Sequence, residues 1–212
     1  MLGISRGCVP KPFKKKQLKE LLKSQSQKVV SASGEELSQL FCMDCNLPIQ
    51  EGRHYQSEDS LICGSCYLSY NLDLLNVKTP GYLIWAPELT QSEVTAFAIA
   101  LVFSSEFEDT EEVLEEIETY FDDKRDLLER TLGEGTSDPS VLCQFLYSLS
   151  DEEYEARGKV LANIRLFPSE EYLAETIHYL KSNELKKYAP ERWVGLLQHV
   201  NAELNKNNNE EQ

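Results

Sequence analysis

The sequence lacks any apolar run long enough to cross a bilayer. Its most apolar stretch, residues 94–103, has only 10 residues, whereas a transmembrane helix needs roughly 20. The first residues are basic but include no apolar stretch of signal-peptide length. We therefore expect a cytosolic protein with reduced thiols, in which paired cysteines indicate a metal site more often than a disulfide.

Residues typical of catalysis are also scarce. The three histidines, His54, His178 and His199, are far apart in the sequence. The glycines of segment 133–139 come without the lysine of a phosphate-binding loop, and the acidic segment 106–126 lacks the spacing of a calcium loop. No pattern combines a nucleophile, a base and an oxyanion hole. These absences favour a binding protein over an enzyme.

Positive charge is confined to the start of an acidic chain. The net charge is −15, yet residues 1–28 contain eight lysines or arginines and one acid, Glu20. The remainder carries about −22 by difference, and residues 106–129 alone contain twelve acids. Such a body repels phosphate backbones, so we expect no nucleic-acid binding by it. The basic arm is either a solvated tail or a contact for nucleic acid, an acidic membrane face or an acidic partner.

Composition and periodicity divide the chain into four parts and predict a mainly α protein with a small N-terminal β element, an α+β fold. The predicted division is a partly disordered basic arm and linker over 1–36 (a short helix over 14–23, a polar linker over 24–36), a zinc-binding module over 37–80, a helical body over 81–206 and a disordered tail over 207–212. From residue 81 onward the pattern is helical throughout.

Start signals locate the helices of the body. Thr90–Glu93 and Ser150–Glu153 fit capping boxes. The helix after Thr90 is apolar on nearly all sides and should be the central one. The remaining helices are predicted over 111–132, after Asp138-Pro139, after Ser169 and after Pro190.

Two CxxC pairs carry the strongest functional signal. Cys42 and Cys45 precede Cys63 and Cys66 by 17 intervening residues, a spacing typical of four-cysteine zinc sites. Each two-residue gap lets both thiolates of a pair bind one ion, and two pairs complete the tetrahedron that zinc prefers in structural sites. Asn46 follows the first pair and tolerates a left-handed conformation. We predict one structural Zn²⁺ bound by these four cysteines.

Other readings of the cysteines stay open at this point. They are a redox pair, an iron–sulfur cluster, a coincidence of spacing, or His54 as a ligand in place of one cysteine. Cys8 and Cys143 lie outside the pattern and are expected to be a surface thiol and a core residue. Between the pairs, a turn at residues 51–52 predicts a hairpin that pairs 48–49 with 54–55.

Three strings after the cysteine pairs point to a family. They are GYLIWAPELTQ at 81–91 with Glu93, GEGTSDP at 133–139 and NIRLFPS at 163–169. In this order they resemble the DotN/IcmJ family of type IVB (Dot/Icm) secretion systems, over roughly residues 41 to 173.

The resemblance implies a function. It implies a zinc-containing, non-catalytic subunit of the type IV coupling complex. Such a subunit binds the C-terminal tail of the coupling ATPase (DotL-like) at the cytoplasmic face of the bacterial inner membrane and helps to recruit effectors. It also implies that the zinc-bearing part is a relic of an HNH nuclease. The segment between the pairs is shorter than in the family, and the arm at 1–23 and the helix at 190–206 are additional.

Two alternatives belong to other classes of protein. One is a zinc-dependent HNH-like nuclease, and the other is a zinc-ribbon regulator that uses the basic arm on nucleic acid. Under the family hypothesis, a partner helix would lie beside the zinc module, with aromatic contacts drawn from Tyr82, Trp85, Phe107 and Trp193. We expect neither nucleic acid nor a small-molecule substrate, and attachment to the membrane only through partners.

Overall fold

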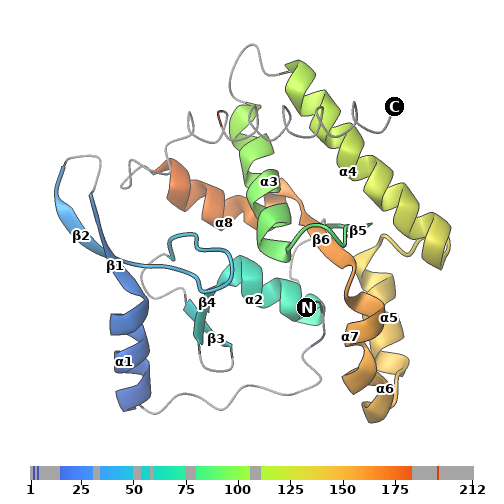
Figure 1. The fold of residues 1–212 in the computed structure, drawn as a ribbon, viewed down its shortest axis with the longest axis horizontal. Helices are drawn as coiled ribbons and strands as arrows, with labels where there is room; N and C mark the ends of the chain where they lie inside the picture. The colour runs from blue at the N-terminus through green and yellow to red at the C-terminus, as the bar shows by residue number, and fades with distance from the viewer. Residues whose placement is uncertain are drawn as a thin grey trace.

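The computed structural model describes residues 2, 4, 15–30, 34–49, 54–57, 60–74, 80–105, 111–182 and 195. Within them the fold is α+β, as predicted, with helices and antiparallel strand pairs (Figure 1). The elements are α1 (Lys15–Gln25), β1 (Ser26–Val30), β2 (Glu36–Leu40), β3 (His54–Ser57), β4 (Ser60–Cys63), α2 (Gly64–Tyr70), the 3₁₀ turn η1 (Leu72–Leu74), β5 (Gly81–Trp85), α3 (Gln91–Ser104), α4 (Glu111–Leu132), α5 (Pro139–Ser148), α6 (Asp151–Ala156), α7 (Gly158–Leu161), β6 (Ile164–Pro168) and α8 (Glu170–Lys181).

The strands form three two-stranded antiparallel pairs within the described residues: β1–β2, β3–β4 and β5–β6. The first pair corrects the expectation of a linker over 24–36, because β1 and the start of β2 lie there. The third pair corrects the expectation of a wholly helical chain after residue 81. Its strands, β5 and β6, are distant in sequence, so no local pattern reveals the partner that completes their hydrogen bonds.

The hairpin between the cysteine pairs also differs from the prediction. His54 pairs with Cys63 and Ser57 with Ser60, so β3 joins β4 rather than residues 48–49. Pro48 instead forms a bridge with Phe41. The turn predicted at residues 51–52 falls outside the described ranges. The pairing of β3 with β4 matters for the cysteines, because β4 ends at Cys63 and α2 begins at the next residue.

The helix α3 is central, as its apolar sequence predicts. Its buried residues include Val94, Ile99 and Phe103, in a cluster with residues of α4, α8 and β5. The capping box at its start is confirmed: the Glu93 amide donates to the Thr90 hydroxyl (3.2 Å), and the Thr90 amide donates to the Glu93 carboxylate (2.7 Å). The helices expected over 111–132 and after 138, 150 and 169 are also present.

A second apolar cluster joins Leu2 and Ile4 to the helical body. Leu2 and Ile4 are buried among residues of β5, β6, α4, α5 and α7. The Tyr154 hydroxyl donates to the Ile4 carbonyl (2.8 Å) and accepts from the Ile4 amide (3.1 Å). The first residues of the arm are therefore part of the body's core.

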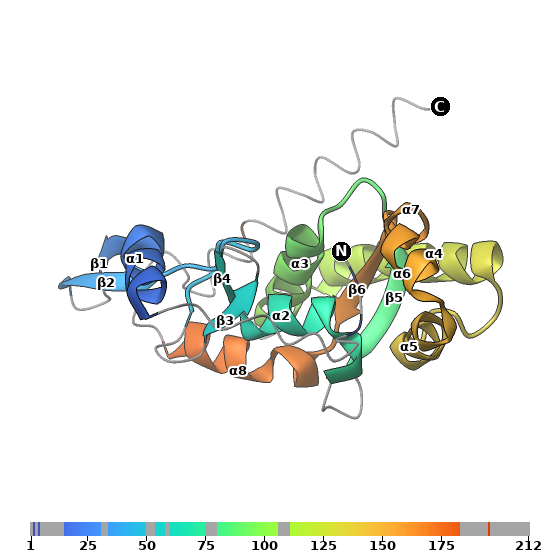
Figure 2. The ribbon, with the colours of Figure 1, turned by 90° about the horizontal axis from the view of Figure 1, so that it is seen from below.

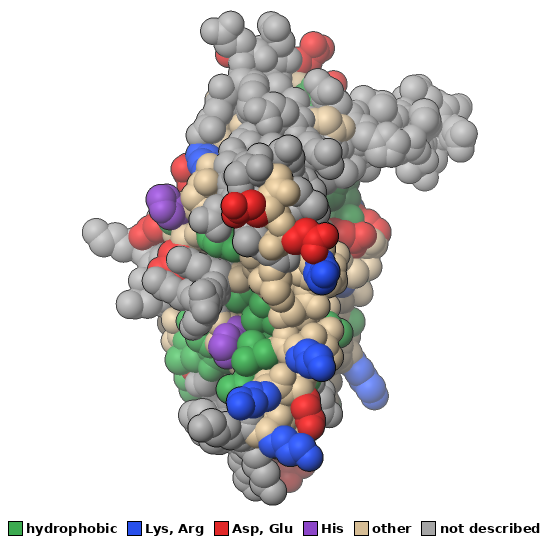
Figure 3. Space-filling view, turned by 90° about the vertical axis from the view of Figure 1, so that its left-hand side faces the viewer, with side chains coloured by type: hydrophobic (Ala, Val, Ile, Leu, Met, Phe, Trp, Pro, Cys, Tyr) green, Lys and Arg blue, Asp and Glu red, His purple; other side chains and the backbone are tan. Residues whose placement is uncertain are grey.

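The molecule is elongated, and basic side chains gather at one part of its surface. The α1–β1–β2 unit lies at one end and α4 with α5 at the other (Figure 2). Lysine and arginine side chains gather in the lower half of the face shown in Figure 3, at the height of α1 in Figure 1. None of the described helices is long and apolar enough to cross a membrane. Of the helix predicted after Pro190 the structure describes only Gly195, which is helical, and the tail lies outside the described residues.

Candidate metal centre

The first cysteine pair lies in a tight turn after β2. The Cys42 amide donates to the Leu47 carbonyl (2.9 Å), and the Asn46 amide donates to the Cys42 carbonyl (3.0 Å). Asn46 has a φ of 53°, the left-handed conformation predicted for it. This conformation reverses the chain after Cys45, so that both sulfur atoms of the pair face the same point.

The second pair is held by the junction of β4 and α2. Cys63 is the last residue of β4 and the N-cap of α2, and Cys66 lies in the first turn of the helix. The Cys66 amide donates to the Cys63 sulfur (3.5 Å), and the Cys63 amide donates to the Cys42 sulfur (3.3 Å). Backbone donors of this kind stabilise thiolates, and the helix N-terminus adds a partial positive charge.

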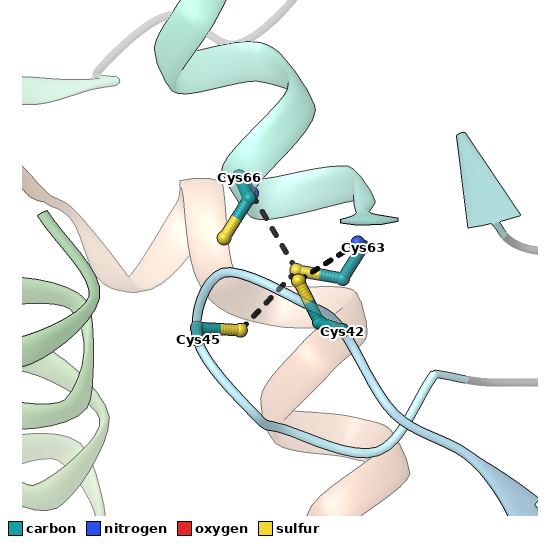
Figure 4. Close-up of side chains that lie close together, drawn as sticks. All are labelled: Cys42, Cys45, Cys63 and Cys66. Atoms are coloured by element: carbon teal, nitrogen blue, oxygen red, sulfur yellow. Dashed lines mark hydrogen bonds between the residues drawn. The ribbon is translucent and has the colours of Figure 1, made fainter. Parts of the chain in front are cut away.

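The four predicted ligands converge (Figure 4). Their sulfur atoms all lie within 4.8 Å of one another. The Cys45 and Cys63 sulfurs are 3.7 Å apart, close to the ~3.8 Å edge of a tetrahedron with Zn–S bonds of about 2.3 Å. That distance also excludes a disulfide, whose sulfurs are ~2.05 Å apart. The donor set and its spacing fit one tetrahedral metal ion, and they favour zinc without identifying it.

The four thiols control one another's protonation. Hydrogen bonds from Cys45, Cys63 and Cys66 hold the pKa of Cys42 well below its usual range. The hydrogen bonds to Cys42, with burial as a further cause, raise the pKa of Cys45 and of Cys66. The thiolate form is thus favoured at Cys42, and burial together with mutual repulsion opposes a further negative charge on Cys45 and Cys66. A bound divalent cation would compensate that repulsion and displace the remaining protons.

Two glutamines connect the cluster to its surroundings. The buried Gln25 side chain accepts from the Leu61 amide (2.9 Å) and donates to the Leu61 carbonyl (2.9 Å), two residues before Cys63. Gln39 donates to the Ile49 carbonyl (2.8 Å) and accepts from the Tyr179 hydroxyl of α8 (2.9 Å). Sequence reasoning missed both residues, because a glutamine in a polar segment carries no signal of burial.

The helix α8 packs against the cysteine module, a name we give to the two cysteine turns together with β3, β4 and α2. The Tyr172 hydroxyl donates to the Ser65 carbonyl, and the Ser65 and Thr176 hydroxyls are hydrogen-bonded at 3.1 Å. Leu47, from the turn of the first pair, is buried in the cluster around α3 and α8. The module is therefore joined to the helical body through both of its cysteine turns.

The other candidates from the sequence lie elsewhere. His54 pairs with Cys63 through the backbone, but its side chain is not part of the group that could hold a metal. Cys143 is a half-buried residue of α5 at the edge of the second cluster, and burial raises its pKa to about 11. Tyr82 stacks on Phe167 with 5.1 Å between ring centroids. Trp85 packs against the second cluster. Cys8, Phe107, Trp193 and His199 lie outside the described residues.

Two clefts border the module. One, of about 460 Å³, lies between the cysteine turns and α8, and exposed Glu171 and Glu175 stand on its α8 side. The other, of about 500 Å³, lies on the side of Met43 and Asp44 and extends to residues at the start of α3. Both are open surfaces of mixed apolar and polar character. They are suited to a polypeptide segment rather than to an enclosed small molecule.

Comparison with known proteins supports the resemblance seen in the three strings. No family model matches the chain. Over 136 residues it is 29% identical to the "Type 4 apparatus protein DotN" of Legionella pneumophila, a match that spans 61% of this chain and 63% of that protein. The aligned region is thus less than two thirds of the relative's length. The chain is similar to DotN, as the order of the three strings after the cysteine pairs predicted.

Proposed function

We propose that this protein is a non-catalytic, zinc-stabilised scaffold subunit of a type IVB secretion coupling complex. In this role it binds the C-terminal tail of the coupling ATPase, at the cytoplasmic face of the bacterial inner membrane, and contributes to a platform for effector recruitment. The observation that carries the proposal is the similarity to a type 4 apparatus protein in a chain whose four predicted cysteines converge.

The metal part of the proposal follows from the donor set. Four sulfur ligands suit zinc, and three of them are buried, which is typical of a structural site rather than a catalytic one. A four-thiolate site leaves no open coordination position for an activated water. Zinc bound by Cys42, Cys45, Cys63 and Cys66 would therefore supply folding free energy and rigidity, not a reaction.

The partner part rests on shape and charge. The cleft between the cysteine turns and α8, which we call the α8 cleft, combines the apolar Leu47, Ile49 and Leu68 with the acidic Glu171 and Glu175. An amphipathic segment of the ATPase tail with basic residues along one edge would complement this surface. We assign the α8 cleft as its docking site.

Co-elution tests the proposal directly. The full chain is run on size exclusion with the tail of the coupling ATPase from the same genome, and zinc is measured in the peak. We expect a stable complex with about one zinc per chain, the content of a single four-thiolate site. Zinc without a complex would contradict the scaffold role while leaving the metal site intact.

Charge reversal tests the assigned surface. Glu171→Lys with Glu175→Lys should weaken tail binding and slow association, since complementary charge acts on the on-rate. Glu152→Lys with Glu155→Lys changes the net charge equally on the exposed face of α6 and should have little effect. Equal loss in both variants would show that overall charge, not the α8 cleft, governs binding.

A nuclease assay separates the competing class. Metal-dependent cleavage of plasmid DNA that disappears in His54→Ala would replace the scaffold proposal with an HNH-like enzyme. We expect no cleavage, because the His54 side chain is not part of the cysteine cluster.

A further inference from the structure

One side of α1 presents a row of lysines. Lys16, Lys19 and Lys23 are all exposed, and at about 100° per residue they share one face of the helix. The buried Gln25 marks the opposite face, since Lys16 lies about 180° from it around the helix. The lysine row, which we call the α1 stripe, therefore points away from the body.

One partly covered apolar side chain borders the stripe. Leu22 is partly exposed and lies about 60° from Lys19 around the helix. Leu18 and Leu21 are also partly exposed, but they lie on the same side of the helix as Gln25. Apolar and basic side chains lie side by side in the lower half of the face in Figure 3. The helix is therefore amphipathic, with a basic outer face and a leucine-rich face toward the body.

Most of the charged residues close to the stripe in the sequence are also basic, which favours binding of an anionic partner. The one acid of α1, Glu20, lies 3.9 Å from Lys16 in an exposed pair. In the sequence, Arg6, Lys11, Lys14 and Lys15 precede the stripe. Lys28 on β1 is paired with Glu36. The acidic helix α4 lies at the opposite end of the molecule (Figure 2), and charges farther apart than about 8 Å are largely screened at physiological salt.

We propose that the α1 stripe binds an anionic lipid surface directly. Clusters of four to eight basic residues are typical of such binding, and α1 carries four lysines. The partly exposed Leu22 adds an apolar contact at the edge of the stripe. The residues of α1 include no arginine and no aromatic side chain, the groups that stack on exposed bases. This inference is independent of the coupling-complex role, in which partners provide the membrane attachment.

Vesicle sedimentation tests the proposal on the full, zinc-bound chain. With a net charge of −15, the protein as a whole should be repelled by vesicles of phosphatidylcholine mixed with phosphatidylglycerol. We expect it instead to sediment with them, to stay in solution with pure phosphatidylcholine, and to be released by added salt. No sedimentation with the anionic vesicles would overturn the proposal.

A matched pair of variants locates the binding surface. Lys19→Glu with Lys23→Glu should lower the vesicle partition coefficient by on the order of 30-fold or more, because each lysine near an anionic surface contributes about fivefold. Arg130→Glu with Lys159→Glu produces the same change of net charge at exposed positions of α4 and α7. That control should bind nearly as the parent does. Equal losses in the two variants would contradict a role for the stripe.

Duplex DNA provides the competing outcome. If DNA shifts the chain at the same salt concentration at which anionic vesicles do not bind, and Lys19→Glu with Lys23→Glu abolishes that shift, the stripe is a nucleic-acid contact and the lipid proposal is wrong. We expect vesicle binding to persist in the presence of excess duplex.

Discussion

At the scale of single residues, the cysteines combine a structural and a chemical role. Cys63 closes β4, caps α2, and its backbone amide donates to the Cys42 sulfur. Substitution by serine, a favoured N-cap residue, therefore removes a predicted metal ligand while the helix cap can be retained. Cys42, Cys45 and Cys66 would remain as three thiols in a largely buried site.

Replacing Cys63 by serine should abolish stoichiometric zinc and lower the unfolding free energy. Zinc binding to four-thiolate sites is worth about 10 kcal/mol or more and is coupled to folding, so we expect a loss of ~3 kcal/mol at least. Metal analysis of the purified protein and chemical denaturation measure the two effects.

The matched control is Cys143→Ser, which alters a half-buried thiol outside the cluster. It should keep one zinc per chain and most of the stability. Full zinc occupancy in Cys63→Ser would rule out this ligand set.

Gln25 is the most informative polar residue outside the ligands. Its side chain satisfies both backbone groups of Leu61 and links the end of α1 to the strand that carries Cys63. Gln25→Ala would leave the buried Leu61 amide unpaired and the Leu61 carbonyl with only its hydrogen bond from the Met43 amide (3.3 Å), at a cost of about 1–3 kcal/mol. Thermal or urea unfolding measures that cost.

Gln27→Ala is the comparison, since Gln27 is exposed on β1. We expect its effect to stay within about 0.5 kcal/mol. A Gln25→Ala variant as stable as the parent would show that water replaces the lost hydrogen bonds.

At the scale of elements, the pairing of β5 with β6 decides the shape of the body. Leu83 and Ile84 of β5, like Ile164 and Leu166 of β6, are buried, so the ribbon has apolar contacts on both sides. It separates the cluster around α3 from the cluster that includes Leu2 and Ile4. Two of the family-like strings supply its strands, residues 81–85 and 164–168.

Gly81 is required for this pairing. Its φ is 115°, and a Cβ at this position would overlap the Phe167 carbonyl of β6. Gly81→Ala should therefore cost more than the ~1 kcal/mol expected from backbone strain alone. The unfolding free energy, compared with that of the parent, measures it.

A substitution at Gly133 separates the cost of backbone strain from the cost of steric overlap with β6. It has the same φ of 115°, but no atom of the described chain beyond its immediate neighbours lies within 4 Å of the point that a Cβ would occupy. Gly133→Ala should therefore show only the backbone cost. If the two variants were equally destabilised, close contact between Gly81 and β6 would not be the cause of its requirement.

At the scale of the whole molecule, the cysteine module and the helical body stabilise each other. Leu47 of the first cysteine turn packs in the core around α3. In turn, Tyr172 and Tyr179 of α8 form hydrogen bonds to Ser65 and Gln39. Metal binding by the four cysteines should therefore also stabilise α8, a helix that carries none of them.

Removing the metal with a chelator should increase hydrogen exchange in β3, β4 and α2, and also in α8. The helices α5 and α6 should change less, since their buried residues belong to the second cluster, which includes none of the four converging cysteines. Restored protection after zinc is added back would confirm reversibility. Protection unchanged throughout the chain would contradict a structural role for the metal.

Local sequence was sufficient for much of this protein. The CxxC spacing predicted which cysteines converge, because two residues between ligands suit one tight turn. The capping boxes at Thr90 and Ser150 marked helix starts that the structure confirms. Capping depends only on a few neighbouring residues, so it can be read before any tertiary contact is known.

Only the tertiary structure decided the rest. The β5–β6 ribbon, the correct partner of β3 and the burial of Gln25 all depend on atoms distant in sequence. A backbone hydrogen bond or a buried amide is stabilised by whichever group the fold brings to it, and composition does not name that group. The sequence by itself thus determined which four cysteines converge and where several helices start, whereas long-range contacts determined how the cysteine module is joined to the helices around it.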